Sequence, residues 1–132
     1  MALKGFKSIS VLGCGRASTM TITNKYFKFN GDTAKELDYP THIVFQINDK
    51  TKQVAIVARN AEDDKAVEFP CKREGERQYA INIAQRAAHV AIRKMMSWDE
   101  RSRKMQGVYV PEENAIIYNL EQATIIQKDD ND

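Results

Sequence analysis

One order of elements, strand then helix then hairpin, recurs twice along this chain of 132 residues, and the recurrence constrains the fold more than any other feature. The first copy is expected at strand 26–29, helix 31–38 and hairpin runs 43–47 and 54–58. The second is expected at strand 78–82, helix 83–96 and hairpin runs 103–110 and 115–120. β-Branched runs joined by polar turns indicate hairpins. The sequence therefore predicts an α+β fold, mainly antiparallel, with two helices, six or seven strands and two related halves.

Cap residues support both helices. Asn30 can accept a backbone N–H of the first turn, and Pro40 ends the first helix because the residue before a proline avoids the helical region. In the second half, Asn82 is the expected cap, with Gln85 at capping-box spacing.

Two further strands are expected near the N-terminus, over 6–12 and 19–23, because apolar and polar residues alternate there. The Gly-Cys-Gly-Arg segment 13–16 lies between them. Its two glycines invite comparison with a phosphate-binding loop, but it lacks a third glycine and a following helix. We therefore predict a turn.

A single domain is expected over residues 1–127, with halves at about 1–60 and 76–127 joined by a charged linker. Val67 and Phe69 within the linker are typical of a short edge strand. The tail 128–132 contains no apolar residue and is expected to be disordered. Free hairpin edges would allow a homodimer.

The predicted core combines one face of each strand with a seam of alanines on the second helix. Its expected members are Ile22, Phe27, Phe29, Leu37, Ile43, Phe45, Ile47, Val54, Ile56, Ala84, Ala87, Ala91, Met95, Val108, Val110, Ile116 and Tyr118.

A cytoplasmic protein without membrane attachment is expected. The apolar runs are much shorter than the roughly 20 residues that span a bilayer. The N-terminal segment lacks the apolar stretch and cleavage site of a signal peptide. Cys14 and Cys71 are far apart in sequence, and reduced thiols are expected for both.

Positive charge is concentrated in residues 72–104, which carry nine Lys or Arg against four Asp or Glu, whereas 105–132 carry one against six. A basic helix flanked by basic loops can follow a phosphate backbone, although such side chains also serve only solubility. The candidate nucleic-acid-binding residues are Lys72, Arg73, Arg77, Arg86, His89, Arg93, Lys94, Arg101, Arg103 and Lys104.

Catalytic and metal sites find little support. A nucleophilic Cys14 or Cys71 needs a neighbouring base, and neither His42 nor His89 is near them in sequence. The same residues have no metal-ligand spacing, and the paired carboxylates fall in expected loops. We expect no catalytic residue, no metal and no cofactor.

The segments GDTAKELDYPTHIVFQINDKTKQVAIVA and GVYVPEENAIIYNLEQA resemble small uncharacterised proteins of phages and mobile elements. The chain is also loosely similar to swapped-hairpin transcription regulators, which place a small helix among four strands and dimerise on DNA. It is longer than these regulators and lacks their arginine-bearing hairpin motif. The resemblance implies a non-enzymatic binding protein.

Three functions follow as expectations. The first is a regulatory nucleic-acid-binding module that uses the basic 72–104 region. The second is a phage-type inhibitor that binds a host protein, such as a defence nuclease or a transcription component. The third is a small enzyme with a cryptic site near Cys14, Cys71 or His89.

Overall fold

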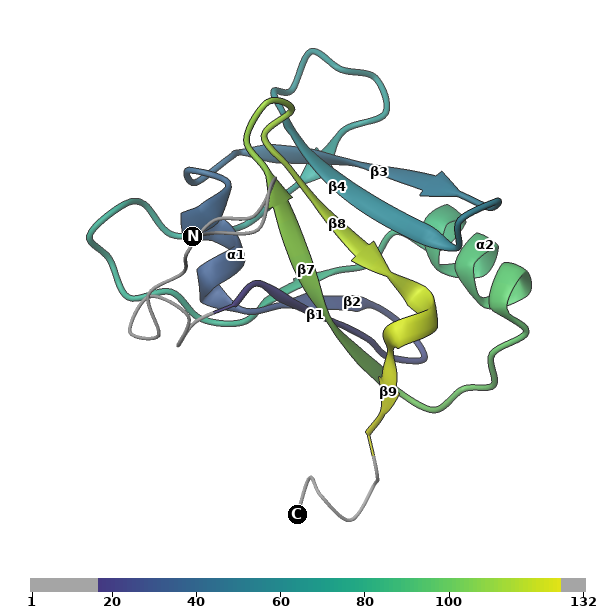
Figure 1. Ribbon diagram of the computed structural model, residues 1–132. Coiled ribbons are helices and arrows are strands. Elements are labelled where there is room, and N and C mark those ends of the chain that lie inside the picture. Colours follow the sequence, from purple (N-terminus) through teal and green to yellow (C-terminus); the bar gives the residue numbers. More distant parts are fainter. Residues whose placement is uncertain (1–16, 127–132) are drawn as a thin grey trace, which may run out of the picture.

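The computed structural model describes residues 17–126 (Figure 1). The expected strand over 6–12, the turn at 13–16 with Cys14, and the tail 128–132 lie outside the described residues. The strands are β1 (Thr19–Ile22), β2 (Phe27–Phe29), β3 (His42–Asn48), β4 (Gln53–Arg59), β5 (Val67–Glu68), β6 (Ile81–Ile83), β7 (Arg103–Val110), β8 (Ala115–Asn119) and β9 (Thr124–Ile125). The helices are α1 (Gly31–Glu36), α2 (Arg86–Met96) and the short 3-10 helix η2 (Leu120–Gln122).

The strands form one sheet in the order β5-β3-β4-β8-β7-β1-β2-β6, and β9 pairs with the start of β7. Every ladder is antiparallel. The sheet is nearly closed, with β5 and β6 at its two ends. Figure 1 shows α1 and α2 on opposite sides of the molecule. This architecture confirms the predicted α+β class.

Most of the strand pairing is repeated when the two halves are exchanged, except that β1 pairs with β2 whereas their counterparts β5 and β6 lie at the two ends of the sheet. The first half, β1-β2-α1-β3-β4, has the same element order as the second, β5-β6-α2-β7-β8. β1 pairs with β7, and its counterpart β5 pairs with β3. The ladders β2–β6 and β4–β8 each join a strand to its own counterpart. The chain thus has an approximate internal two-fold relation, as the recurrence in the sequence predicts.

The hairpin turns show the same correspondence. Each contains four residues, between Asn48 and Gln53 in one half and between Val110 and Ala115 in the other. Lys52 and Asn114, the last residues of the two turns, both have positive φ angles, of 57° and 47°. Aligning the turns makes His42 on β3 the counterpart of Lys104 on β7.

The expected homodimer through free hairpin edges stays a prediction, because neighbouring strands cover only part of these edges. β4 pairs with β8 inside the chain, and β3 and β7 have β5 and β1 on their other sides. β5 and β1 cover only residues 42–43 of β3 and 103–106 of β7, so residues 44–48 and 108–110 have no strand partner on that side among the described residues.

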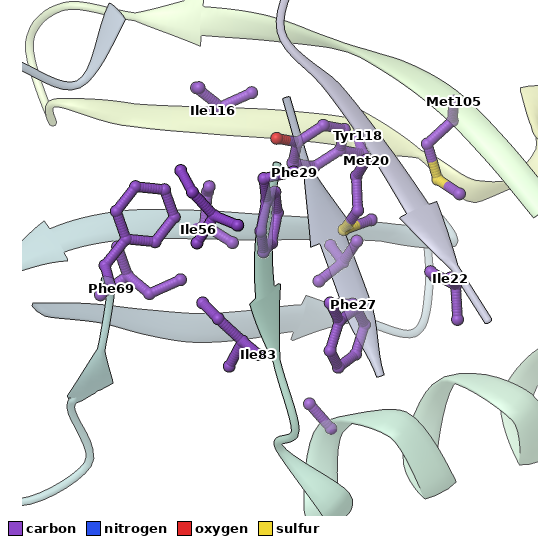
Figure 2. Packing of buried hydrophobic residues seen from close by; sticks show 14 of the residues in the cluster. Met20, Ile22, Phe27, Phe29, Ile56, Phe69, Ile83, Met105, Ile116 and Tyr118 are labelled. Atoms are coloured by element: carbon purple, nitrogen blue, oxygen red, sulfur yellow. The ribbon is translucent and has the colours of Figure 1, made fainter. Parts of the chain in front are cut away.

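The core lies inside the curled sheet, where aromatic rings from β2 meet the opposite strands (Figure 2). The ring centroid of Phe27 lies 4.7 Å from that of Phe45, and Phe29 packs against Phe69 at 5.7 Å. Most of the predicted core is buried, including Ile22, Ile56 and Tyr118.

Five predicted core residues are wrong: Ile47, Ala84, Ala87, Ala91 and Val108 are exposed. The alanine seam faces outward, and α2 instead buries Ala88, His89 and Ile92. An alanine removes little apolar surface from water, so turning Ile92 inward stabilises the protein more.

One predicted cap is confirmed and the other is wrong. Asn30 caps α1, since its Oδ1 accepts from the backbone N of Thr33 at 3.3 Å. Asn82 lies within β6, and Gln85 caps α2 through a 3.0 Å bond from the Ala88 N–H. Residue 82 is held in the sheet by its pairing with Lys28 on β2.

β7 is shared by the two parts of the sheet, and its main pairing partner changes at Gly107. Residues 103–106 pair with β1, and residues 107–110 pair with β8. A Cβ atom at Gly107 would lie 2.3 Å from Ile116 Cγ2 and 2.6 Å from Tyr118 Cε2. Only glycine allows the backbone to approach β8 this closely.

Neither α1 nor α2 has the length and apolar character needed to cross a bilayer, and this statement covers the described residues only.

Candidate nucleic-acid interface

The ten basic residues singled out from the sequence do not form one surface. Lys72, Arg73 and Arg77 are exposed in the loop before β6, where Arg77 and Gln78 line a hollow beside α1. Arg86 and Lys94 are exposed on α2, on the opposite side of the molecule (Figure 1). Of the remaining residues, His89 and Arg93 lie on α2 and contact the turn between β1 and β2. Arg101 lies in the segment before β7, and Arg103 and Lys104 lie on β7.

His89 and Arg93 face inward and hold the turn between β1 and β2. His89 is buried, and its Nε2 lies 2.6 Å from the carbonyl oxygen of Thr23. Because a carbonyl can only accept, Nε2 carries the proton. Arg93 donates to the same oxygen at 2.9 Å and also to the carbonyl of Asp99. Burial lowers the pKa of Arg93, and the nearby charge of Arg103 adds to this effect.

Arg103 and Arg101 are held by the segment that follows α2. The Arg103 guanidinium lies 4.6 Å from the centre of the Trp98 ring and 3.4 Å from Asp99 Oδ1. Arg101 contacts Asp99 Oδ2 at 2.7 Å. The hydrogen bond from the Arg101 side chain is the main reason why the pKa of Asp99 falls to about 2. Arg103 is buried by these contacts and is therefore poorly placed to bind a ligand, whereas Arg101 stays exposed beside Asp99.

Replacing Arg93 with alanine is expected to lower the free energy of unfolding by about 1–3 kcal/mol, because the Thr23 and Asp99 carbonyls lose a charged donor. Arg86→Ala, on the exposed face of the same helix, is the matched control and should change it by less than about 0.5 kcal/mol. Urea denaturation measures both. Equal effects of the two substitutions would contradict the inward role of Arg93.

The exposed face of α2 is mixed in character. It presents Ala87, Val90 and Ala91 between Arg86 and Lys94, and Val90 is 50% exposed. Two cations separated by three apolar residues make a weak track for a phosphate backbone. The helix therefore does not form the continuous basic surface that the sequence indicated.

A row of polar and cationic side chains crosses the outer face of the sheet at β9, β7, β1, β2 and β6. Strand register places Thr124, Lys104, Thr21, Lys28 and Asn82 side by side across β9, β7, β1, β2 and β6. Lys28, Lys104, Asn82 and Thr124 are exposed, and Thr21 is half-buried. Neighbouring strands lie about 4.8 Å apart, so the two lysines flank Thr21 at a separation of about 10 Å. We call this set the lysine row.

A hollow of about 370 Å³ lies over the lysine row. Hydroxyl groups line it from Thr19, Thr21 and Thr23 on one side and from Ser102 on the other. Tyr26 also lines it, next to Lys28 and Lys104. Among the described residues around this hollow there is no carboxylate.

Negative charge is excluded from this part of the sheet. The strands β1, β2, β6, β7 and β9 contain no Asp or Glu, whereas they contain Lys28, Arg103 and Lys104. A surface with ammonium groups, hydroxyls and no carboxylate is suited to an anion. Of the predicted site residues, Lys104 alone belongs to it.

The corresponding surface in the other half is less cationic. Lys104 pairs with Thr21, and their counterparts are His42 and Glu68, which pair in the same way. His42 also pairs with Arg59 on β4, and Arg59 contacts Asp63 at 3.4 Å. The acidic residues Glu68 and Asp63 therefore offset the positive charge there. The internal two-fold relation thus leaves only one strongly cationic face.

Sequence reasoning missed Lys28, Thr21, Tyr26 and Asn82. The alternation in 19–23 does place the threonines opposite Met20 and Ile22, and this signal was available. The pairing of β1 with both β2 and β7, which brings the two lysines beside Thr21, was not visible in any local pattern.

The described residues offer no alternative chemical centre. Cys71 Sγ donates to the Pro40 carbonyl at 3.4 Å, and burial raises the pKa of the thiol, which disfavours the reactive thiolate. Within residues 17–126, no group of three or more His, Cys, Asp or Glu side chains is arranged to hold a metal ion.

Comparisons with models of protein families, with curated proteins and with solved structures found no match to this chain. The resemblances inferred from the sequence therefore remain predictions.

Proposed function

We propose that the protein is a nucleic-acid-binding module whose contact surface is the lysine row and the hollow above it. The observation that carries the proposal is the placement of Lys28 and Lys104 on either side of Thr21, on a sheet face without carboxylates. This keeps the class of function predicted from the sequence and moves the surface from α2 to the sheet.

Charge and hydrogen bonding both favour a phosphate backbone. Lysine ammonium groups neutralise phosphates and release counterions, which makes the binding dependent on salt. Threonine and serine hydroxyls add donors to phosphate oxygens and sugars, and such contacts make up most hydrogen bonds in nucleic-acid complexes. Thr19, Thr21 and Ser102 provide these hydroxyls next to the lysines.

The test is fluorescence anisotropy with labelled DNA and RNA over a range of salt concentrations. The double variant Lys28→Gln/Lys104→Gln should bind more weakly and should lower the slope of log K against log salt by about 2, one for each phosphate contact. Lys50→Gln/Lys65→Gln changes the net charge equally, at exposed positions in the turns that precede β4 and β5.

This control should reproduce the wild-type affinity and slope. The proposal is wrong if the two double variants behave alike, or if the wild type binds no nucleic acid at low salt.

A protein partner is the second candidate, favoured by an apolar row elsewhere on the sheet. Val108 pairs with Ile117, and Ile117 pairs with Ala55. Val108 is 68% exposed, the largest exposed fraction among the large hydrophobic side chains described. An absence of nucleic-acid binding at low salt would favour this candidate, which corresponds to the expected inhibitor of a host protein.

A further inference from the structure

The geometry of the hollow points to a single-stranded ligand, and we propose that one base stacks on Tyr26 while Lys28 and Lys104 hold neighbouring phosphates. This inference rests on the proposed function and specifies the form of nucleic acid.

Tyr26 shares the outer face of β2 with Lys28. Phe27 and Phe29 are buried, so by alternation Lys28 and Tyr26 point to the other side of the strand. Tyr26 is half-buried and lines the hollow together with Lys28 and Lys104. Two residues along an extended chain span about 7 Å, so the Cα atoms of Tyr26 and Lys28 are separated by about the length of one nucleotide.

The tyrosine is held in place before any ligand binds. Thr23 Oγ1 accepts from the Tyr26 N–H at 3.0 Å and donates to the Tyr26 carbonyl at 3.1 Å. The Thr23 carbonyl accepts in turn from His89 and Arg93 on α2. The turn is therefore fixed from both sides. A fixed backbone places Tyr26 at the hollow before any ligand binds, so less conformational freedom is lost on binding, which favours affinity.

A duplex fits this surface less well than a single strand. Bases in a duplex are stacked on their neighbours and cannot lie on a tyrosine ring, whereas those of a single strand can be splayed out. The major groove is usually read by a helix, but the exposed face of α2 alternates between Arg86, Lys94 and three apolar residues. A hollow of about 370 Å³ is in the size range of pockets for small molecules, which suits a single nucleoside.

The hydroxyl groups explain how such a site would bind without strong sequence preference. Thr19, Thr21 and Ser102 can each donate and accept, so they can adapt to different base edges or to a ribose hydroxyl. Stacking on an aromatic ring is likewise tolerant of the base. We therefore expect a modest preference among bases.

The experiment measures anisotropy of a labelled single-stranded oligonucleotide and of the same sequence as a duplex. Wild-type protein should bind the single strand at least about tenfold more tightly. Tyr26→Leu should weaken single-strand binding by about 5- to 100-fold, as loss of one stacking contact does elsewhere. Tyr26→Phe should retain most of the affinity, because its ring still stacks.

Tyr79→Leu is the matched control. Tyr79 is 60% exposed beside Arg77 and does not line the hollow, so its loss should leave the affinity unchanged. Circular dichroism establishes that each variant is folded, and the wild-type preference for single strands tests the proposal even if Tyr26→Leu does not fold.

Different results would overturn the single-strand inference and the proposed function. Equal or tighter binding of the duplex, or equal affinities of Tyr26→Leu and Tyr26→Phe, would overturn the single-strand inference while leaving the lysine row intact. Unchanged binding by Lys28→Gln/Lys104→Gln would overturn the proposed function itself.

Discussion

Replacing Gly107 with alanine is expected to destabilise the protein by about 1–3 kcal/mol, although it adds only one methyl group. The new Cβ would lie 2.3 Å from Ile116 Cγ2 and 2.6 Å from Tyr118 Cε2. Both neighbours are fully buried, so neither can move aside without displacing other core side chains. Urea denaturation should show a lower midpoint with little change in slope.

Gln106→Ala is the matched control for Gly107→Ala. Gln106 is exposed on the adjacent position of the same strand, so the effect should stay within about 0.5 kcal/mol. A wild-type midpoint for Gly107→Ala would mean that β7 and β8 do not approach as closely as described.

Replacing Asn30 with alanine is expected to cost about 2–3 kcal/mol, more than the roughly 1 kcal/mol of an ordinary helix cap. Its Oδ1 accepts from Thr33 N, Thr33 Oγ1 and Thr19 N, the last at 3.1 Å. Its Nδ2 donates to the Ala17 carbonyl at 2.7 Å. The side chain thus joins the start of α1 to the start of β1, the strand that carries Thr21 of the lysine row.

Gln85→Ala is the corresponding change in the other half. Gln85 caps α2 through one bond, to Ala88 N, so about 1 kcal/mol or less should be lost. Thermal and urea unfolding of the two variants give the comparison. If Gln85→Ala were as damaging as Asn30→Ala, the additional bonds of Asn30 to β1 would contribute nothing to stability.

Local patterns in the sequence were sufficient for most elements. The two hairpins were predicted at 43–47 with 54–58 and at 103–110 with 115–120, and they form as β3–β4 and β7–β8. β-Branched residues and polar turns are local signals, so no knowledge of distant contacts was needed. The recurrence of elements predicts two related halves, but it does not predict which strands pair between them.

The orientation of α2 could not be predicted in the same way. Periodicity predicts that the alanine seam is the buried face of this helix, and charge predicts that His89 and Arg93 face a ligand. The structure buries Ala88, His89 and Ile92 because the Thr23 carbonyl accepts from His89 and Arg93. A basic side chain that donates to a carbonyl far away in the sequence gives the same local pattern as one that is exposed to solvent.

The candidate site was hidden for a related reason. Charge density along the chain pointed to 72–104, whereas the lysine row combines Lys104 with Lys28 from a different region. These residues meet only because β1 lies between β2 and β7. Long-range strand pairing, rather than composition, thus defines the proposed surface.

The most direct test of the central proposal is mapping of amide chemical shifts by NMR while a single-stranded oligonucleotide is titrated into the protein. The account predicts that the largest shifts occur at Thr21, Tyr26, Lys28 and Lys104, with little change at the exposed residues of α2 or in the loop 72–77. Shifts concentrated at Arg86, Lys94 and residues 72–77, with the sheet face unaffected, would contradict it and restore the surface first predicted from the sequence.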